Sequence, residues 1–212
     1  MLPAIDSLLT LALSSVLLSL APGPDNIFVL TLSALYGRKS GFFVVLGLCT
    51  GLVVHTTLVA FGVAAIFQTS TTAFNGLKII GAAYLLYLAW QAVKASQEDT
   101  SSKTAIPELG FSALYRRGIV MNLTNPKVSI FFLAFLPQFA NPEAAAIAPQ
   151  IFLFGFIFIL ATFIVFNFIA LLSGSISHWF SRSTRAQSYL NKIAALVFFL
   201  LALSLIAPIF RQ

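Results

Sequence analysis

The sequence predicts an all-α integral membrane protein with six transmembrane helices arranged as a 3+3 inverted repeat. The composition is 59% hydrophobic and only 8% charged, whereas soluble domains carry roughly 25% charged residues. Six apolar segments are each long enough to cross about 30 Å of hydrocarbon, which takes about 20 helical residues. The first and the fourth of these segments are interrupted at matching positions, so helices 1 and 4 are expected to be broken near the bilayer midplane.

The six predicted spans divide into two groups of three. They cover residues 7–36, 41–67, 73–93, 111–139, 147–173 and 189–209. The stretch KASQEDTSSKTAIPELG between the third and fourth spans is rich in Ser, Thr and charge, which is typical of a flexible linker. We therefore expect a first three-helix repeat at 1–93, a hydrophilic cytoplasmic linker at 94–110 and a second, inverted three-helix repeat at 111–212.

Lysine and arginine predict the orientation of the bundle, because cytoplasmic loops carry the positive excess. Nine of the 12 basic residues follow the first, third or fifth span: Arg38, Lys39, Lys94, Lys103, Arg116, Arg117, Arg182, Arg185 and Lys192. Both termini are therefore predicted on the non-cytoplasmic side. With so few charges in the chain, the basic excess does not indicate nucleic-acid binding. It also favours contact with anionic membrane lipid.

The first interruption is the stretch SLAPGPDNIF. Pro22 and Pro24 remove two backbone donors and Gly23 frees the chain to turn, so the helix is expected to unwind here. Asp25 is expected to cap a half-helix that begins at Asn26.

The second interruption is the stretch MNLTNPKVSIFF, in which Asn125 stands one hundred positions after Asp25. Asn125 followed by Pro126 is typical of a polar cap with proline in the first helical position. A single kink is common in transmembrane helices, but two broken helices at matching positions indicate a transporter site at the midplane. Both half-helices are then expected to present free N–H groups and positive dipole ends to one central space.

Four stretches resemble a known family over nearly the whole chain: PGPDN, GRKSGFFVVLGLCTG, GAAYLLYLAWQA and NLTNPKVSIFFLAFLPQF. They are similar to the LysE-type amino-acid exporters, in particular the homoserine and threonine exporter (RhtB) branch. The resemblance implies export of small amino acids or close derivatives, such as homoserine, threonine or leucine, driven by the proton-motive force. It also implies a multi-pass protein of the bacterial cytoplasmic (inner) membrane. The exported amino acid and the oligomeric state, including a homodimer, are left open.

Ionisable groups inside a membrane are costly and usually functional. Asp25 is expected either to cap its half-helix or to bind a substrate ammonium and carry the coupling proton. Lys127 is expected to contact Asp25, either as a neutralising partner or as a group that alternates between Asp25 and a substrate carboxylate. The substrate-binding set also includes Gly23, Asn26, Asn122, Asn125 and Tyr84.

For other polar and small residues in the spans, the sequence gives weaker evidence of a role in transport. His55 is expected either to relay protons or to hydrogen-bond a neighbouring helix, and Asn167 is a similar case. Gly47, Gly51 and Gly62 are expected to let helices pack closely.

An intramembrane enzyme and a passive channel are the rival classes. The sequence lacks HExxH and GxSxG, and one cysteine with two histidines gives no expected metal site or cofactor. It also lacks a P-loop, so any pumping must be secondary rather than driven by ATP. Charged residues near the midplane, where two helices are broken, suit a carrier that occludes its substrate better than an open pore.

Overall fold

The computed structural model describes residues 5–69, 71–95, 109–141, 144–180 and 184–210, and every regular element within these ranges is a helix. Four helices are long and apolar enough to cross a membrane: α3 (Arg38–Thr69), α4 (Thr71–Ala95), α7 (Ile147–Phe180) and α8 (Thr184–Ile206). A short 3₁₀ helix, η3 (Ala207–Phe210), follows α8. The predicted all-α membrane fold is confirmed.

Two further spans are bent pairs of helices. α1 (Ile5–Leu20) and α2 (Pro24–Tyr36) meet at 59°, and α5 (Phe111–Thr124) meets the helical segment Pro126–Phe139 at 53°. That segment consists of α6 (Pro126–Ile130), a π-helical turn η1 (Phe131–Phe135) and a 3₁₀ turn η2 (Leu136–Phe139). If each bent pair is one span, the bundle has the six predicted spans with breaks in the first and fourth.

Proline determines where the second half of each broken helix begins. Pro24 and Pro126 occupy the first turn of α2 and α6, where the missing N–H has no intrahelical partner to lose and the fixed φ suits the helix. Gly23 is therefore the N-cap of α2, and Asp25 lies inside its first turn. The prediction that Asp25 caps a helix starting at Asn26 is wrong, because the helix has already started at Pro24.

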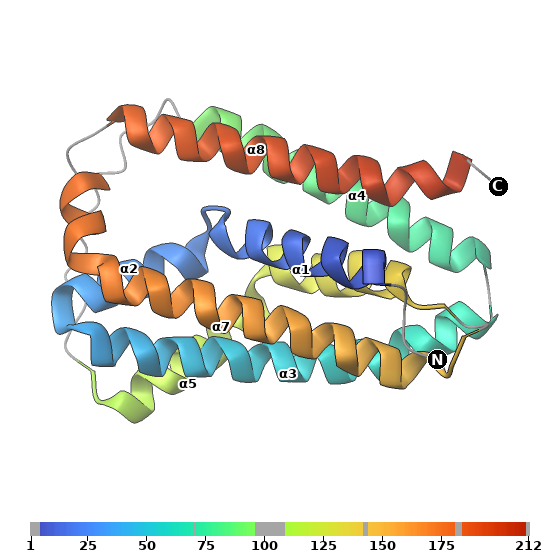
Figure 1. The fold of residues 1–212 in the computed structure, drawn as a ribbon, viewed down its shortest axis with the longest axis horizontal. Helices are drawn as coiled ribbons and strands as arrows, with labels where there is room; N and C mark the ends of the chain where they lie inside the picture. The colour runs from blue at the N-terminus through green and yellow to red at the C-terminus, as the bar shows by residue number, and fades with distance from the viewer. Residues whose placement is uncertain (1–4, 70, 96–108, 142–143, 181–183, 211–212) are drawn as a thin grey trace.

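Helices from one predicted half of the chain pack against helices from the other half. α3 packs against α5, and α7 packs against both α1 and α2. α4 and α8 lie side by side along one face of the bundle (Figure 1). The second span of each half thus contacts the broken span of the other half, as an inverted repeat would produce. The division into repeats at 1–93 and 111–212 stays a prediction.

The helix ends that carry basic residues gather at one end of the bundle. The junction of α2 with α3, the end of α4, the start of α5 and the junction of α7 with α8 lie there (Figure 1). The start of α1 and the end of α8 lie at the opposite end. Most of the predicted linker (residues 96–108, with Lys103), together with Arg182 and Arg211, lies outside the described residues. Which end faces the cytoplasm stays a prediction.

Two clusters of buried apolar side chains lie on either side of the breaks. The first contains a block of aromatic rings: Phe131, Phe132, Phe135, Phe154 and Phe158. The second includes Val29, Leu32, Val44, Leu48 and Phe166. Along the first span the first cluster ends at Ala21 and the second begins at Val29, so the polar break separates the two apolar cores.

Glycines set the contact between α3 and the span broken at Asn125. A Cβ at Gly47 would overlap the carbonyl of Tyr115, and a Cβ at Gly51 would overlap the side chain of Asn122. These two predictions of close packing are confirmed. The prediction for Gly62 is wrong, because a Cβ there would meet nothing within 4 Å.

Candidate functional site

A buried ion pair joins the two breaks. Nζ of Lys127 lies 3.2 Å from Oδ1 of Asp25, and the two residues are only 4% and 3% exposed. The predicted contact between them is confirmed. Removing a charge from water costs several kcal/mol unless a partner compensates it, so each residue neutralises the other where no solvent does.

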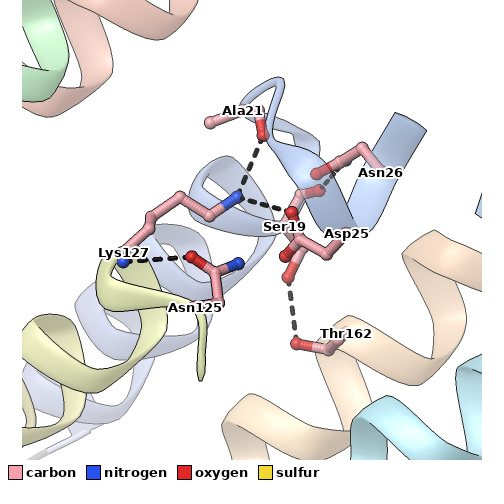
Figure 2. A network of polar contacts seen from close by, with 7 residues as sticks. All are labelled: Ser19, Ala21, Asp25, Asn26, Asn125, Lys127 and Thr162. Atoms are coloured by element: carbon pink, nitrogen blue, oxygen red, sulfur yellow. Dashed lines mark hydrogen bonds and ion pairs between the residues drawn. The ribbon is translucent and has the colours of Figure 1, made fainter. Parts of the chain in front are cut away.

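The backbone around each break is held by the residues of the site. The side chain of Asn125 caps α6 by accepting a hydrogen bond from the Lys127 N–H at 3.0 Å. The ammonium of Lys127 also donates to the carbonyl of Ala21 at 3.2 Å, just beyond the end of α1. Lys127 therefore stabilises the break in the first span from a position in the fourth, as Figure 2 shows.

A second polar chain runs from α2 to α7. Nδ2 of Asn26 donates to the Ser19 carbonyl at 2.6 Å, and the hydroxyls of Ser19 and Thr162 lie 3.0 Å apart (Figure 2). Ser19 and Thr162 are both buried. Neither was predicted from the sequence, although Ser19 belongs to the interrupted stretch and Thr162 is an isolated polar residue in the apolar α7.

Three buried amide atoms on residues at or within a few positions of the two breaks have no hydrogen-bond partner among the described residues. They are the Oδ1 acceptors of Asn26 and Asn122 and the Nδ2 donor of Asn125. An unsatisfied buried polar atom costs about 1–3 kcal/mol, and such atoms are rare in native proteins. The segments around the breaks therefore hold two acceptors and one donor that no described residue satisfies, in addition to the two charges.

Gly23 provides the space in which the ion pair forms. A Cβ at this position would lie 2.7 Å from Oδ1 of Asp25 and 2.7 Å from Nζ of Lys127. The backbone of Gly23 is extended, with φ −165°, so the requirement for glycine comes from space rather than from backbone conformation.

His55 lies next to the second break but not in the ion pair. Its Nε2 is 3.4 Å from the carbonyl oxygen of Asn122, and its ring packs 5.7 Å from the ring of Phe132. The hydrogen bond to a neighbouring helix is thus the observed arrangement. A role in proton relay stays a prediction.

The structure does not bring Tyr84 to the ion pair. Tyr84 is half-buried on α4 and its ring contacts Tyr87, on a helix that packs mainly against α8. Asn167 donates to the Phe163 carbonyl of its own helix at 2.8 Å. Gly47, expected to let helices pack closely, is covered by α5. No described contact therefore links these three residues to the site.

A groove of about 530 Å³ lies between α2 and α5 and reaches both breaks. Its lining includes Pro24, Thr124, Asn125 and Pro126 beside the breaks, and Arg116 and Arg117 on the first turns of α5. The described part of the chain has no cluster of three or more His, Cys, Asp or Glu side chains that could hold a metal ion. The groove thus reaches Pro24 of the first break and Asn125 of the second.

Comparison with protein families gives one match over nearly the whole chain. The model of the family described as LysE type translocator matches residues 16–208.

Individual relatives are similar over almost their full length. The homoserine/homoserine lactone efflux protein of Salmonella typhi is 36% identical over 191 residues, which cover 89% of this chain and 90% of that protein. The leucine efflux protein of Salmonella choleraesuis (strain SC-B67) is 28% identical over 192 residues, 89% of each chain. No solved structure matches the chain significantly.

Proposed function

Because this chain belongs to the LysE type translocator family, we propose that it is a secondary active exporter of small, neutral amino acids or close derivatives such as homoserine, threonine or leucine. Similar proteins are efflux proteins for homoserine and for leucine. A translocator moves its substrate without converting it, so the chain is not an intramembrane enzyme. The observation that carries the proposal is the buried ion pair between Asp25 and Lys127, placed where two broken helices meet.

A zwitterionic amino acid can replace both partners of this ion pair at once. Its ammonium takes the place of Lys127 at Asp25, and its carboxylate takes the place of Asp25 at Lys127. No buried charge is left alone by this exchange, whereas a solute with a single charge leaves one residue uncompensated at a cost of several kcal/mol. The empty site and the loaded site are then both neutral, which suits a carrier that must cross the membrane in either state.

The three unsatisfied amide atoms have the chemistry to bind the same substrate. Oδ1 of Asn26 and Oδ1 of Asn122 accept hydrogen bonds from the substrate ammonium, and Nδ2 of Asn125 donates to its carboxylate. Each atom lacks a partner among the described residues, so each is free to bond the substrate without breaking a bond within the protein. Gly23 contributes by leaving room for this exchange.

A proton is a second species that can neutralise Asp25, provided that the substrate carboxylate remains as the partner of Lys127. Asp25 is the only buried acidic residue in the part of the chain that the structure describes. Lys127 of α6 is in contact with Asp25, whereas the ring of His55 on α3 lies against the carbonyl of Asn122. We propose that a proton entering at Asp25 displaces the substrate ammonium and couples export to the proton-motive force.

The proposed setting is the bacterial cytoplasmic membrane, with both termini on its outer side. The basic residues at the α2–α3 junction, the end of α4 and the start of α5 support this orientation. Alternating access would come from rocking of the two predicted repeats around the fixed site.

A test of this function is transport by the purified full chain in proteoliposomes loaded with labelled homoserine. We expect saturable counterflow against unlabelled homoserine, and net export that a proton gradient accelerates. Linear, non-saturating flux without counterflow would identify a passive channel instead. Absence of any flux for homoserine, threonine and leucine, in protein that stays folded, would contradict the proposed substrate class.

A further inference from the structure

The groove between α2 and α5 connects one end of the bundle with the two breaks. We infer that this groove is the water-filled entrance by which the substrate, led by its carboxylate, passes from Arg116 and Arg117 to the ion pair. The inference rests on the proposed function for the identity of the substrate. It adds an entry route and two positioning residues that the sequence did not indicate.

The walls of the groove are single faces of two helices. On α5, Arg116, Arg117, Val120, Met121 and Thr124 all line it, and this spacing of one helical turn forms a continuous stripe. From Arg116 to Asn125 the stripe rises about 13 Å, at about 1.5 Å per residue. On α2 the facing wall is Pro24 and Phe28, also one turn apart. The path is therefore straight and ends at the start of α2.

The inner end of the groove offers a donor to an arriving carboxylate. Asn125 lines the groove, is 3% exposed and has an Nδ2 donor with no partner among the described residues. Two residues further on, in the turn that Asn125 caps, is Lys127, whose ammonium already faces Asp25. A carboxylate that reaches Asn125 is thus within the site where the proposed exchange takes place.

The outer end carries two exposed positive charges. Arg116 and Arg117 are exposed on the first turns of α5, at the end of the bundle where the other basic loops gather. Arginine binds carboxylates through paired N–H donors, and clustered positive charge raises the local concentration of anions. The stripe between them and Asn125 is mostly apolar, so a carboxylate is attracted at both ends and held weakly in between.

The opposite side of the breaks is closed. There the rings of Phe131, Phe132 and Phe158 stack within 5.0–6.3 Å of one another, all nearly inaccessible. A groove on one side and a packed aromatic block on the other are what a carrier shows when its site opens to one side only.

Cysteine labelling tests whether the groove holds water. Thr124→Cys lies on the groove, and Leu123→Cys is the matched control, because Leu123 is exposed at the preceding position of the same helix but does not line the groove. We expect the anionic reagent methanethiosulfonate ethylsulfonate to modify Thr124→Cys in inside-out vesicles, at least tenfold faster than Leu123→Cys, and not in right-side-out vesicles. The parent chain, with Cys49 buried, is the blank.

The other labelling outcomes would contradict the entrance. If only a lipophilic maleimide modified Thr124→Cys, a lipid chain would occupy the groove. If Thr124→Cys and Leu123→Cys reacted equally with the anionic reagent, the groove would not be a distinct path. None of these readouts depends on transport, so a failure of the proposed function would not hide the result.

Transport kinetics test the two arginines. In the variant that combines Arg116→Gln with Arg117→Gln we expect KM for homoserine to rise, on the order of two- to fivefold for each exposed charge lost, with kcat unchanged. Raised salt should reduce the difference, because it screens exposed charges. Arg38→Gln removes a charge at the same end but outside the groove lining and should leave KM unchanged. Equal effects of Arg38→Gln and the arginine pair, or an effect on kcat alone, would overturn the role of the arginines.

Discussion

Asp25 and Lys127 are 102 positions apart in the chain and form a buried ion pair with 3.2 Å between Oδ1 and Nζ. The contact joins the break in the first span to the break in the fourth. It is therefore both a structural tie between the two broken helices and the group of charges that a substrate would have to separate. These two roles predict different results in single and double variants.

The first prediction is that single variants lose stability and the neutral double variant regains it. Asp25→Asn or Lys127→Gln leaves one buried charge without a partner, and we expect the free energy of unfolding to fall by about 3–5 kcal/mol. Combining both substitutions removes both charges and should restore most of the loss. Thermal unfolding in detergent measures this series.

Transport separates the two roles of the ion pair. The double variant should bind and export no homoserine even though it is folded, because neither substrate charge has a partner. A folded double variant with normal export would show that the pair is only structural.

A second prediction concerns the space around the pair. Gly23→Ala places a methyl group 2.7 Å from both charged atoms, so we expect the pair to be forced apart and export to fall by at least tenfold. The matched control is Gly62→Ala, also in a span, where a Cβ meets nothing within 4 Å; export should be normal. Normal export by Gly23→Ala would show that the close approach of Asp25 and Lys127 is not needed.

Much of this fold could be predicted because its main signals are local. Proline and glycine interrupt helices wherever they stand, and a carboxylate and a lysine buried at the same depth must pair. For these reasons the six spans, both breaks and the contact between Asp25 and Lys127 were predictable. The cap was predicted two positions too late, at Asp25 instead of Gly23, because Pro24 itself suits the first helical turn.

The remaining features depend on which helix faces meet. A span that is apolar on every side has no periodic pattern to mark its inner face, so nothing in the sequence indicated that Tyr84 would contact Tyr87 or that Thr162 would lie beside Ser19. The groove between α2 and α5 is likewise a product of packing. Its only local signal is the stripe of residues from Arg116 to Thr124.

A third prediction addresses orientation. Gly110 is exposed with open space around it, and Ala146 is exposed at the other end of the bundle. We expect Gly110→Cys to react with an impermeant thiol reagent only from the cytoplasmic side, and Ala146→Cys only from outside. One span, the broken fourth one, separates these two positions. Labelling of both from the same side would mean that this span does not cross the membrane, which would contradict the six-span inverted repeat.

A fourth prediction distinguishes the two roles considered for His55. The ring lies near a backbone carbonyl of Asn122, which cannot take up a proton at neutral pH. His55→Gln keeps a hydrogen-bond donor but does not titrate, and we expect export driven by a proton gradient to be retained within about twofold. His55→Leu removes the donor and should lower stability by about 1–3 kcal/mol. Loss of gradient-driven export in His55→Gln, with counterflow intact, would instead support a proton relay.

The last prediction concerns which solutes the site accepts, and it follows from the charges that the exchange requires. A substrate that lacks its carboxylate leaves Lys127 and Nδ2 of Asn125 without partners, and one that lacks its ammonium leaves Asp25 and the amide oxygens of Asn26 and Asn122 without partners. Each unpaired neutral group costs about 1–3 kcal/mol and each unpaired charge more, so at least a tenfold loss of affinity is expected in both cases.

Side-chain selectivity should be much weaker, because a methylene group more or less changes binding by only about 1–3 kcal/mol. The measurement is competition against labelled homoserine efflux in proteoliposomes. Homoserine, threonine and leucine should compete within about a hundredfold of one another, whereas their decarboxylated amines and N-acetyl derivatives should compete far more weakly than each parent. An amine that competes as well as its parent amino acid would mean that Lys127 and Asn125 do not bind the carboxylate, and that the second break serves only to hold the first in place.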